Sequence, residues 1–178
     1  LIYISRAAEL IHRLGEGVAA PVLLSLVRSI VTGFREDLIP EFRHYGEALT
    51  SFGRGLNGHS PPPEAYVGLN PAKAMALTVE HGSAPPEELY RSLLAVNAQN
   101  MLTFDLTCLD DIDQPYGSDP GWLDFSHGLT FADAVYSLCK RYPELWPAGL
   151  LQMACFAGRN VGHADPAVAL EDWVVSEP

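Results

Sequence analysis

The sequence predicts an all-α protein, a single globular domain of about six to eight packed helices with two long loops. Apolar residues recur at the three- and four-residue spacing of an α-helix along most of the chain, and no segment alternates as a β-strand does. The chain has 178 residues, of which 48% are hydrophobic and 19% are charged, which is typical of a protein with a large core. We therefore expect residues 1–178 to form one helical domain.

Three helical segments are expected before the first loop. The first runs from about Ile2 to Leu14 and ends at Gly15, a residue typical of helix C-terminal caps. The second runs from about Ala19 to Thr32, and its one polar side consists of Ser25, Arg28, Ser29 and Thr32. The third, "FREDLIPEFRHYGEAL", is interrupted at Pro40 and ends near Gly53.

The first long loop is expected at residues 53–69, which are rich in glycine and proline. Asn70 then has the position of a helix N-cap, Pro71 has the first helical position, and Gly82 follows the end of this helix. The next helix is expected from about Glu87 to Thr107.

The second long loop is expected at residues 110–121, "DDIDQPYGSDPG", which are acidic and rich in turn-forming residues. A helix over residues 122–139, "WLDFSHGLTFADAVYSLC", follows it, and residues 143–147 form a corner between two prolines. Residues 148–158, "AGLLQMACFAG", are apolar almost all round, so we expect this helix to be buried. The tail from Ala164 closes the chain.

The helix over residues 122–139 raises the main functional question, because Asp124 falls inside its apolar arc and His127 lies at the border of that arc. The solvent-facing side collects Ser126, Thr130, Asp133, Ser137, Lys140 and Arg141. The apolar side collects Phe125, Leu129, Phe131, Ala132, Val135, Leu138 and Cys139. Burying an unpaired carboxylate costs several kcal/mol, so the fold must supply Asp124 with a partner.

Three interpretations of this D-x-x-H motif stay open, and one of them is that the motif is simply exposed to solvent. Asp124 and His127 are three residues apart, so they share a helix face and can act on one ligand, as a metal site or an acid–base pair. Alternatively, the helix dipole stabilises Asp124 in the first turns, and His127 is an ordinary core residue.

Two amides and several aromatic rings are further candidates for a binding site. Asn97 and Asn100 project with apolar residues from one helix face, where they either bridge neighbouring helices or line a cavity and orient a polar ligand. Aromatic residues, among them Phe131 and Trp122, form either core alone or the wall of a pocket for a flat aromatic substrate.

Charge argues against two classes of partner. Lysine and arginine number 11 against 22 acidic residues, so the formal net charge is -11, and the chain repels nucleic acid and anionic membranes. No apolar run reaches the roughly 20 residues of a membrane span. The sequence also lacks H-E-x-x-H, G-x-S-x-G and a phosphate-binding glycine loop.

The cysteines indicate the redox compartment of the protein, and the first residues indicate whether the chain is part of a larger assembly. Cys108, Cys139 and Cys155 have no metal or redox spacing, which favours reduced thiols in the cytoplasm. The opening "LIYISRAAELIHRLG" begins with leucine and already has the pattern of a packed helix. We therefore expect the C-terminal part of a longer polypeptide or a subunit of a complex, with an N-terminal fragment or a partner subunit elsewhere.

Three segments together resemble the C-terminal half of the questin oxidase-like family: residues 28–42, the "LYRSLLAVNAQNMLTFD" helix and "WLDFSHGLTFADAV". The resemblance implies a helical oxygenase that opens rings of anthraquinone-like polyketides, with non-heme iron in at least one member and NADPH as co-substrate in others. It implies that His127 is a metal ligand and that Asp124 orients its imidazole. The family's histidine-rich N-terminal segment has no counterpart here, and no lysine stands near Trp122 to serve as a carboxylated ligand.

The sequence therefore predicts an oxygenase-type oxidoreductase acting on a small aromatic or polyketide-like substrate. In this hypothesis Asp124 and His127 are the catalytic pair, and Asn97, Asn100, Phe131 and Trp122 bind substrate. The alternative is a non-catalytic helical subunit or interaction domain in which Asp124 and His127 form a structural pair.

Overall fold

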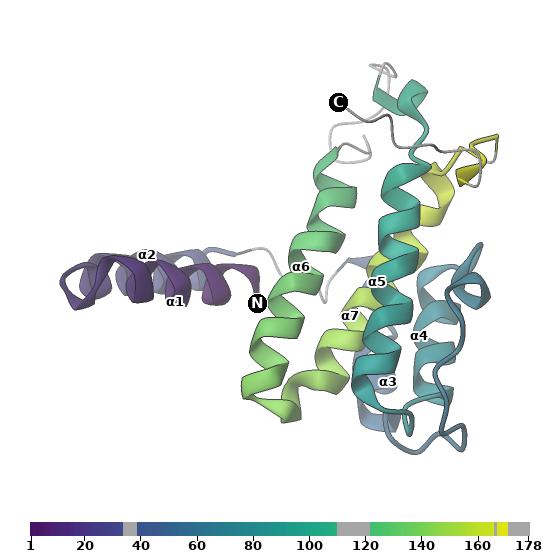
Figure 1. Cartoon of the computed structure of the whole chain (residues 1–178), viewed down its shortest axis with the longest axis horizontal. Helices are drawn as coiled ribbons and strands as arrows, with labels where there is room; N and C mark the ends of the chain where they lie inside the picture. The colour runs from purple at the N-terminus through teal and green to yellow at the C-terminus, as the bar shows by residue number, and fades with distance from the viewer. Residues whose placement is uncertain (34–38, 110–121, 166, 171–178) are drawn as a thin grey trace, which may run out of the picture.

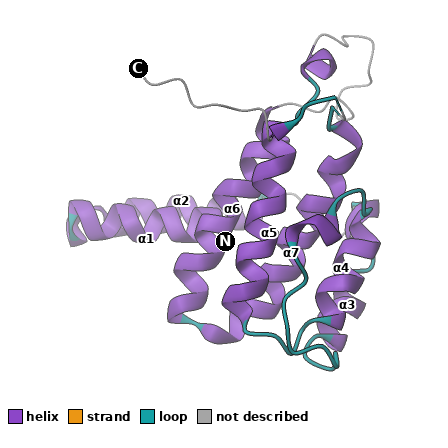
Figure 2. Cartoon of the chain, turned by 45° about the vertical axis from the view of Figure 1, so that its right-hand side comes forward, coloured by secondary structure: helices purple, strands orange, loops and turns teal. Residues whose placement is uncertain are grey.

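The computed structural model describes residues 1–33, 39–109, 122–165 and 167–170, and only the backbone of residues 109 and 122–125. Within these residues the chain forms α-helices joined by loops and short 3-10 turns and contains no β-strand, which confirms the predicted all-α class (Figure 2). The helices are α1 Ile2–Leu14, α2 Ala19–Val31, α3 Tyr45–Ser51, α4 Pro71–Glu80, α5 Pro86–Leu102, α6 Trp122–Arg141 and α7 Trp146–Asn160. None of the described helices is long and apolar enough to cross a membrane.

Helix α7 lies at the centre of the packed body, in contact with α3, α4, α5 and α6 (Figure 1). Ten of its 15 residues are buried, including Leu150, Leu151 and Met153, which have no exposed surface. The prediction that residues 148–158 are buried is therefore confirmed. The helices that cover this apolar surface belong to the same chain.

Glycines let two helices approach α7 closely. A Cβ on Gly158 would lie 2.5 Å from the backbone nitrogen of Pro71, at the first turn of α4. A Cβ on Gly149 would lie 2.7 Å from a methyl group of Val135 in α6. Both distances are below any normal carbon contact, so these crossings exist only because neither position carries a side chain.

Helix α6 has the two sides that its periodicity predicts. The side chains of Thr130, Asp133, Ser137, Lys140 and Arg141 are exposed. Ala132, Val135 and Cys139 are fully buried against the rest of the core. Burial raises the pKa of the Cys139 thiol to about 11, so this sulfur stays protonated at neutral pH.

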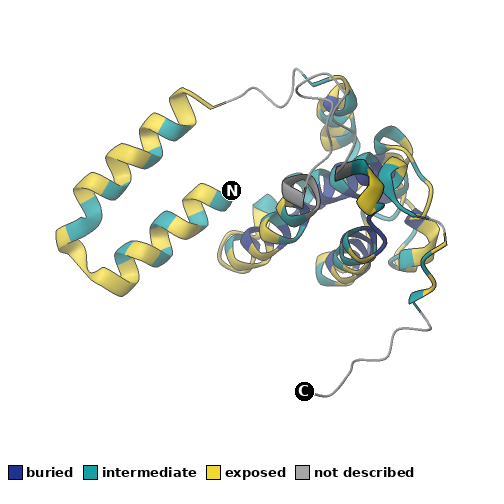
Figure 3. Cartoon of the chain, turned by 90° about the horizontal axis from the view of Figure 1, so that it is seen from above, coloured by how far each residue is buried: buried dark blue, intermediate teal, exposed yellow. Residues whose placement is uncertain are grey.

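Helices α1 and α2 form a hairpin that extends away from the body (Figures 1 and 3). The start of α1 contacts α6, where Arg6 forms an ion pair with Asp133, while the main contacts of α2 are with α1. No residue of either helix is buried, as the exposed and intermediate colours of Figure 3 show. The hairpin therefore lies outside the core that α7 organises.

The expected fourth helix is confirmed at its start, whereas the fifth ends earlier than predicted. The side chain of Asn70 accepts a hydrogen bond from the backbone N–H of Lys73 at 3.0 Å, as an N-cap does. Helix α5 ends at Leu102, not near Thr107. The reason is tertiary, because the backbone beyond α5 pairs with residues 163–165, which remove it from the helical path.

The close contact at Gly158 makes a prediction about stability. Gly158→Ala should lower the free energy of unfolding by about 1–3 kcal/mol, because the new methyl group forces α4 and α7 apart. The stated loss is the net effect, after the gain of about 1 kcal/mol that alanine brings in helix propensity. Gly46→Ala in α3 is the matched control, since a Cβ there meets nothing within 4 Å and should raise stability by about 0.5–1 kcal/mol. Urea unfolding measures both, and equal effects of the two changes would contradict the close packing.

A buried tyrosine makes a prediction about pH. Tyr66 is 2% exposed, its hydroxyl lies 3.1 Å from that of Thr78, and burial raises its pKa to about 12. Between the unfolded pKa of about 10 and this value the native state keeps a proton that the unfolded state loses. Stability should therefore fall by up to about 1.4 kcal/mol per pH unit above pH 10, and Tyr66→Phe should reduce that slope. An unchanged slope in urea unfolding at alkaline pH would contradict the burial of this hydroxyl.

Candidate functional site

A cavity of about 310 Å³ opens beside His127, where α1, α6 and α7 meet. Its lining consists of Leu1, Ile2, Tyr3, His127, Phe131, Phe156 and Arg159. The volume lies at the lower end of the range of about 300–1,000 Å³ that is typical of small-molecule pockets. The cavity is therefore the candidate site on which the predictions for His127 can be examined.

The side chains of α6 and α7 that line this cavity come in pairs, because residues one helical turn apart lie on the same helix face. His127 and Phe131 are one turn apart on α6, and Phe156 and Arg159 are one turn apart on α7. The Phe131 and Phe156 rings meet edge to face, with centroids 5.4 Å apart and planes inclined by 64°. This geometry is favourable for aromatic pairs, so the two rings form a fixed apolar wall beneath the polar groups.

The polar groups of the cavity differ in exposure. His127 is exposed, although it borders the cavity, whereas Arg159 is half-buried. The sequence placed His127 at the edge of the apolar arc, and the structure puts it on the solvent side of that edge. The exposed imidazole thus lies at the solvent side of the cavity, and the guanidinium adds a permanent positive charge to the lining.

Two predicted site residues lie outside the part of the chain whose side chains are described. Asp124 and Trp122 belong to the first turn of α6, for which only the backbone is described. The predicted contact between Asp124 and His127, and the substrate-binding role of Trp122, therefore stay predictions. Phe131, the third candidate of this helix, does line the cavity.

Asn97 and Asn100 are buried between α5 and α7, 2% and 6% exposed. The amide nitrogen of Asn97 donates to the backbone oxygens of Leu93, at 2.8 Å, and of Met153, at 3.1 Å. The amide nitrogen of Asn100 donates to the backbone oxygen of Ala157 at 2.9 Å. These bonds are the helix-bridging arrangement, one of the two alternatives that the sequence left open. A role of either amide in substrate binding stays a prediction.

The other amide atom of Asn97 brings α6 into the same contact. Its Oδ1 is buried without a hydrogen-bond partner among the described residues, and a Cβ on Gly128 would lie 2.9 Å from it. Gly128 follows His127 directly in the sequence. The absence of a side chain at Gly128 therefore determines how closely the His127 segment of α6 approaches α5.

The described residues do not fit an iron centre at His127. A non-heme iron site of the kind implied by the resemblance needs at least two further histidine or carboxylate ligands beside the imidazole. No group of three or more histidine, cysteine, aspartate or glutamate side chains in the described part of the chain could hold a metal ion. We therefore derive no reaction step through a metal. A whole dinucleotide such as NADPH is also large for a cavity of about 310 Å³.

Sequence reasoning included Phe156 among the aromatic residues that could wall a pocket, but it missed Arg159 as a residue of the cavity. Both lie on α7, whose other residues are apolar and mostly buried. Arg159 is the only charged residue of that helix, and a lone cation at the end of an apolar helix is a signal that could have found it. Nothing in the sequence indicated that the start of α1 would close the third side of the cavity.

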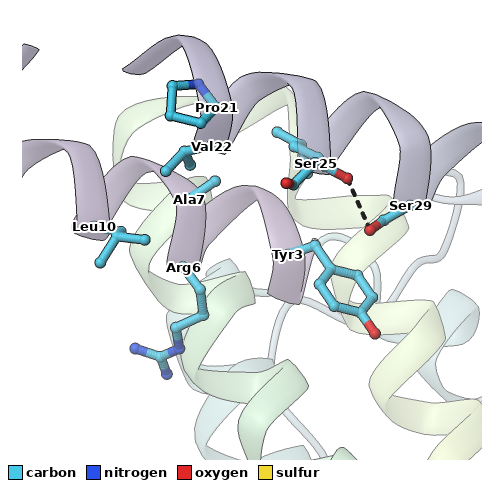
Figure 4. Close-up of a pocket in the computed structure, with 9 residues that line it drawn as sticks. Tyr3, Arg6, Ala7, Leu10, Pro21, Val22, Ser25 and Ser29 are labelled. Carbon is cyan, nitrogen blue, oxygen red and sulfur yellow. Dashed lines mark hydrogen bonds between the residues drawn. The ribbon is translucent and has the colours of Figure 1, made fainter. Parts of the chain in front are cut away.

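A second hollow lies between α1 and α2, and Tyr3 lines both this hollow and the cavity beside His127 (Figure 4). It has a volume of about 370 Å³, and apolar side chains such as Tyr3, Leu10 and Val22 line it together with Ser25 and Ser29. The Ser29 hydroxyl donates to the backbone oxygen of Ser25 at 3.0 Å, which Figure 4 shows as a dashed line. The hollow is an open groove along the hairpin, and the polar side predicted for the second helix borders it.

No family model, no curated protein and no solved structure matches this chain. The resemblance to the questin oxidase-like family therefore stays a prediction from the quoted segments. The site and its chemistry are argued below from the geometry of the residues themselves.

Proposed function

We propose that the cavity beside His127 binds a flat aromatic anion, and that this ligand is the substrate of an oxygenase-type ring oxidation. The observation that carries the binding half is the combination of an aromatic wall, Phe131 and Phe156, with the guanidinium of Arg159 in one cavity. The oxidation half is proposed from the resemblance of the quoted segments to ring-opening oxygenases.

Each cavity residue has a distinct task in this proposal. The Phe131–Phe156 wall excludes water from one face of the ligand ring and holds that ring by edge and face contacts. Arg159 orients the ligand through its permanent positive charge, which attracts a carboxylate to its side of the cavity. His127 lies at the exposed side of the cavity, where it can hydrogen-bond a phenol or quinone oxygen or move a proton there. Dioxygen and a reductant such as NADPH are supplied from outside this cavity.

A second candidate function is the non-catalytic helical interaction domain. It is supported by the α1–α2 hairpin, which concentrates exposed large apolar side chains outside the core. Large contiguous apolar patches on a protein surface mark interaction sites. The two candidates use different surfaces, so both can hold for one chain.

Ligand binding at the cavity is measurable with a defined probe. Isothermal titration of the purified protein with anthraquinone-2-carboxylate should show binding, which anthraquinone-2-carboxamide should reproduce only weakly because it lacks the charge. Arg159→Gln should lower the affinity about tenfold or more, the value of a lost hydrogen bond to a charged group. Arg54→Gln, at an exposed arginine of the α3–α4 connection, is the matched control and should leave the affinity unchanged.

Two results would contradict the proposal separately. Equal affinity of the wild type and Arg159→Gln, or of the carboxylate and the carboxamide, contradicts anion recognition at this cavity. If the full-length protein binds the probe but consumes no oxygen in the presence of NADPH, the oxygenase half is wrong and binding alone remains.

A further inference from the structure

Helix α2 presents a continuous apolar stripe to solvent. Its members, called the α2 stripe here, are Leu23, Leu24, Val27, Ile30 and Val31. Their exposed fractions range from 48% for Leu23 to 77% for Val31. The spacing of three and four residues places all five on one helix face. In folded proteins an apolar helix face of this kind is normally covered by another segment or by another molecule.

The partner helix within the hairpin leaves this face open. Helix α1 partly covers Val22 and Leu26, which lie on the neighbouring flank of α2. The groove of Figure 4 lies on this same flank, where Val22 and Leu26 line it together with Ser25 and Ser29, and no residue of the α2 stripe lines it. No described segment covers the α2 stripe, and Figure 3 shows the outer sides of the hairpin as exposed.

We infer that the α2 stripe docks against the α2 stripe of a second copy of this chain, around a two-fold axis near Val27. The stripe is symmetric about that residue, because Leu23 and Leu24 precede it by four and three positions and Ile30 and Val31 follow it by three and four. Antiparallel pairing then sets aliphatic side chains of similar size opposite one another, which is the self-complementarity that a two-fold interface requires.

The distribution of charge favours contact through the hairpins. Residues 1–33 contain three arginines and two glutamates, a formal charge of +1, whereas residues 34–178 contain eight basic and 20 acidic residues, a charge of -12. Arg28 is the only charged residue of α2. Two copies that meet at α2 therefore avoid the repulsion between their acidic bodies, from which the hairpin extends (Figure 1).

The area of the α2 stripe sets the expected affinity between the two copies. Helix α2 has 13 residues and is about 20 Å long, and the five side chains of the α2 stripe are between 48% and 77% exposed along it. Two such faces together bury on the order of 1,000 Å² of accessible surface, the lower end of the range for specific interfaces. A dimer with a dissociation constant in the micromolar range is the expected result.

The same residues disfavour a lipid surface as the occupant. Helices that lie on membranes carry lysine and arginine on the polar face, where these bind anionic headgroups. The polar side of α2 consists of Ser25, Ser29 and Thr32 with Arg28 alone. It thus offers hydroxyl groups where a membrane-binding helix offers a row of cations.

Sedimentation velocity over a series of protein concentrations tests this inference, which deepens the second candidate function and is independent of ligand binding at His127. The wild type should shift from monomer to dimer in the micromolar range. Val27→Glu should weaken self-association at least about a hundredfold, because it buries two unpaired carboxylates at the axis. Ser25→Glu, the same change on the polar side of α2, should leave the dissociation constant unchanged. Circular dichroism checks that both variants keep the helical content of the wild type.

A cross-link provides a second readout. Val27→Cys should form a disulfide-linked dimer under mild oxidation, because a two-fold axis near residue 27 brings the two cysteines together, whereas Ser25→Cys and the wild type should not. A wild type that stays monomeric at all concentrations overturns the inference. So does a dimer that Ser25→Glu disrupts and Val27→Glu leaves intact, or a monomer that binds phosphatidylcholine or phosphatidylglycerol vesicles through the α2 stripe.

Discussion

The hydrogen bonds from two buried asparagines of α5 to the backbone of α7 are the interaction on which the rest of this structure depends. Asn97 reaches Met153, and Asn100 reaches Ala157, at 3.1 and 2.9 Å. Three residues separate the donors and four separate the acceptors, so the bonds fix both the distance between the helices and their relative rotation. In a core of aliphatic side chains, which pack without direction, such directional bonds select one arrangement.

The candidate cavity depends on the same contacts. Oδ1 of Asn97 lies against Gly128, which directly follows His127, and Ala157, which accepts from Asn100, lies two positions before Arg159. The two polar groups of the cavity are therefore carried on helix segments that the amides hold in place. A ligand that uses both groups finds them already positioned, which lowers the entropy cost of binding.

Much of the fold follows from local sequence, because helical periodicity and capping residues act over a few positions. The burial of α7, the two sides of α6 and the cap at Asn70 were all predictable in this way. The early end of α5 was not, since it results from pairing with residues 163–165, far away in the sequence. A hydrophobic pattern also cannot distinguish a face that meets the core from one that meets another molecule, and the exposed side of α2 illustrates this.

The site was predictable only in part, for the same reason. Periodicity placed His127 at the border of an apolar arc, but whether a border residue is covered depends on the neighbouring helix, and the start of α1 forms one wall of a cavity that stays open to solvent. The pairing of Phe131 with Phe156, and the approach of Arg159, require two helices to cross at one angle. That angle is set by Gly149 and by the amides of α5, which no local pattern on α6 or α7 reveals.

The most direct test is the stability of Asn97→Asp, measured by urea unfolding at neutral and at acidic pH. The change replaces the donating amide by an oxygen that faces the carbonyls of Leu93 and Met153. At pH 7 stability should fall by about 3–5 kcal/mol, the cost of an unpaired buried charge. The folded-state pKa of the new carboxyl is raised, so the loss should diminish as the pH falls and the protonated group donates again. Gln99→Glu on the same helix should change little, and an Asn97→Asp protein as stable as the wild type at pH 7 would contradict the account.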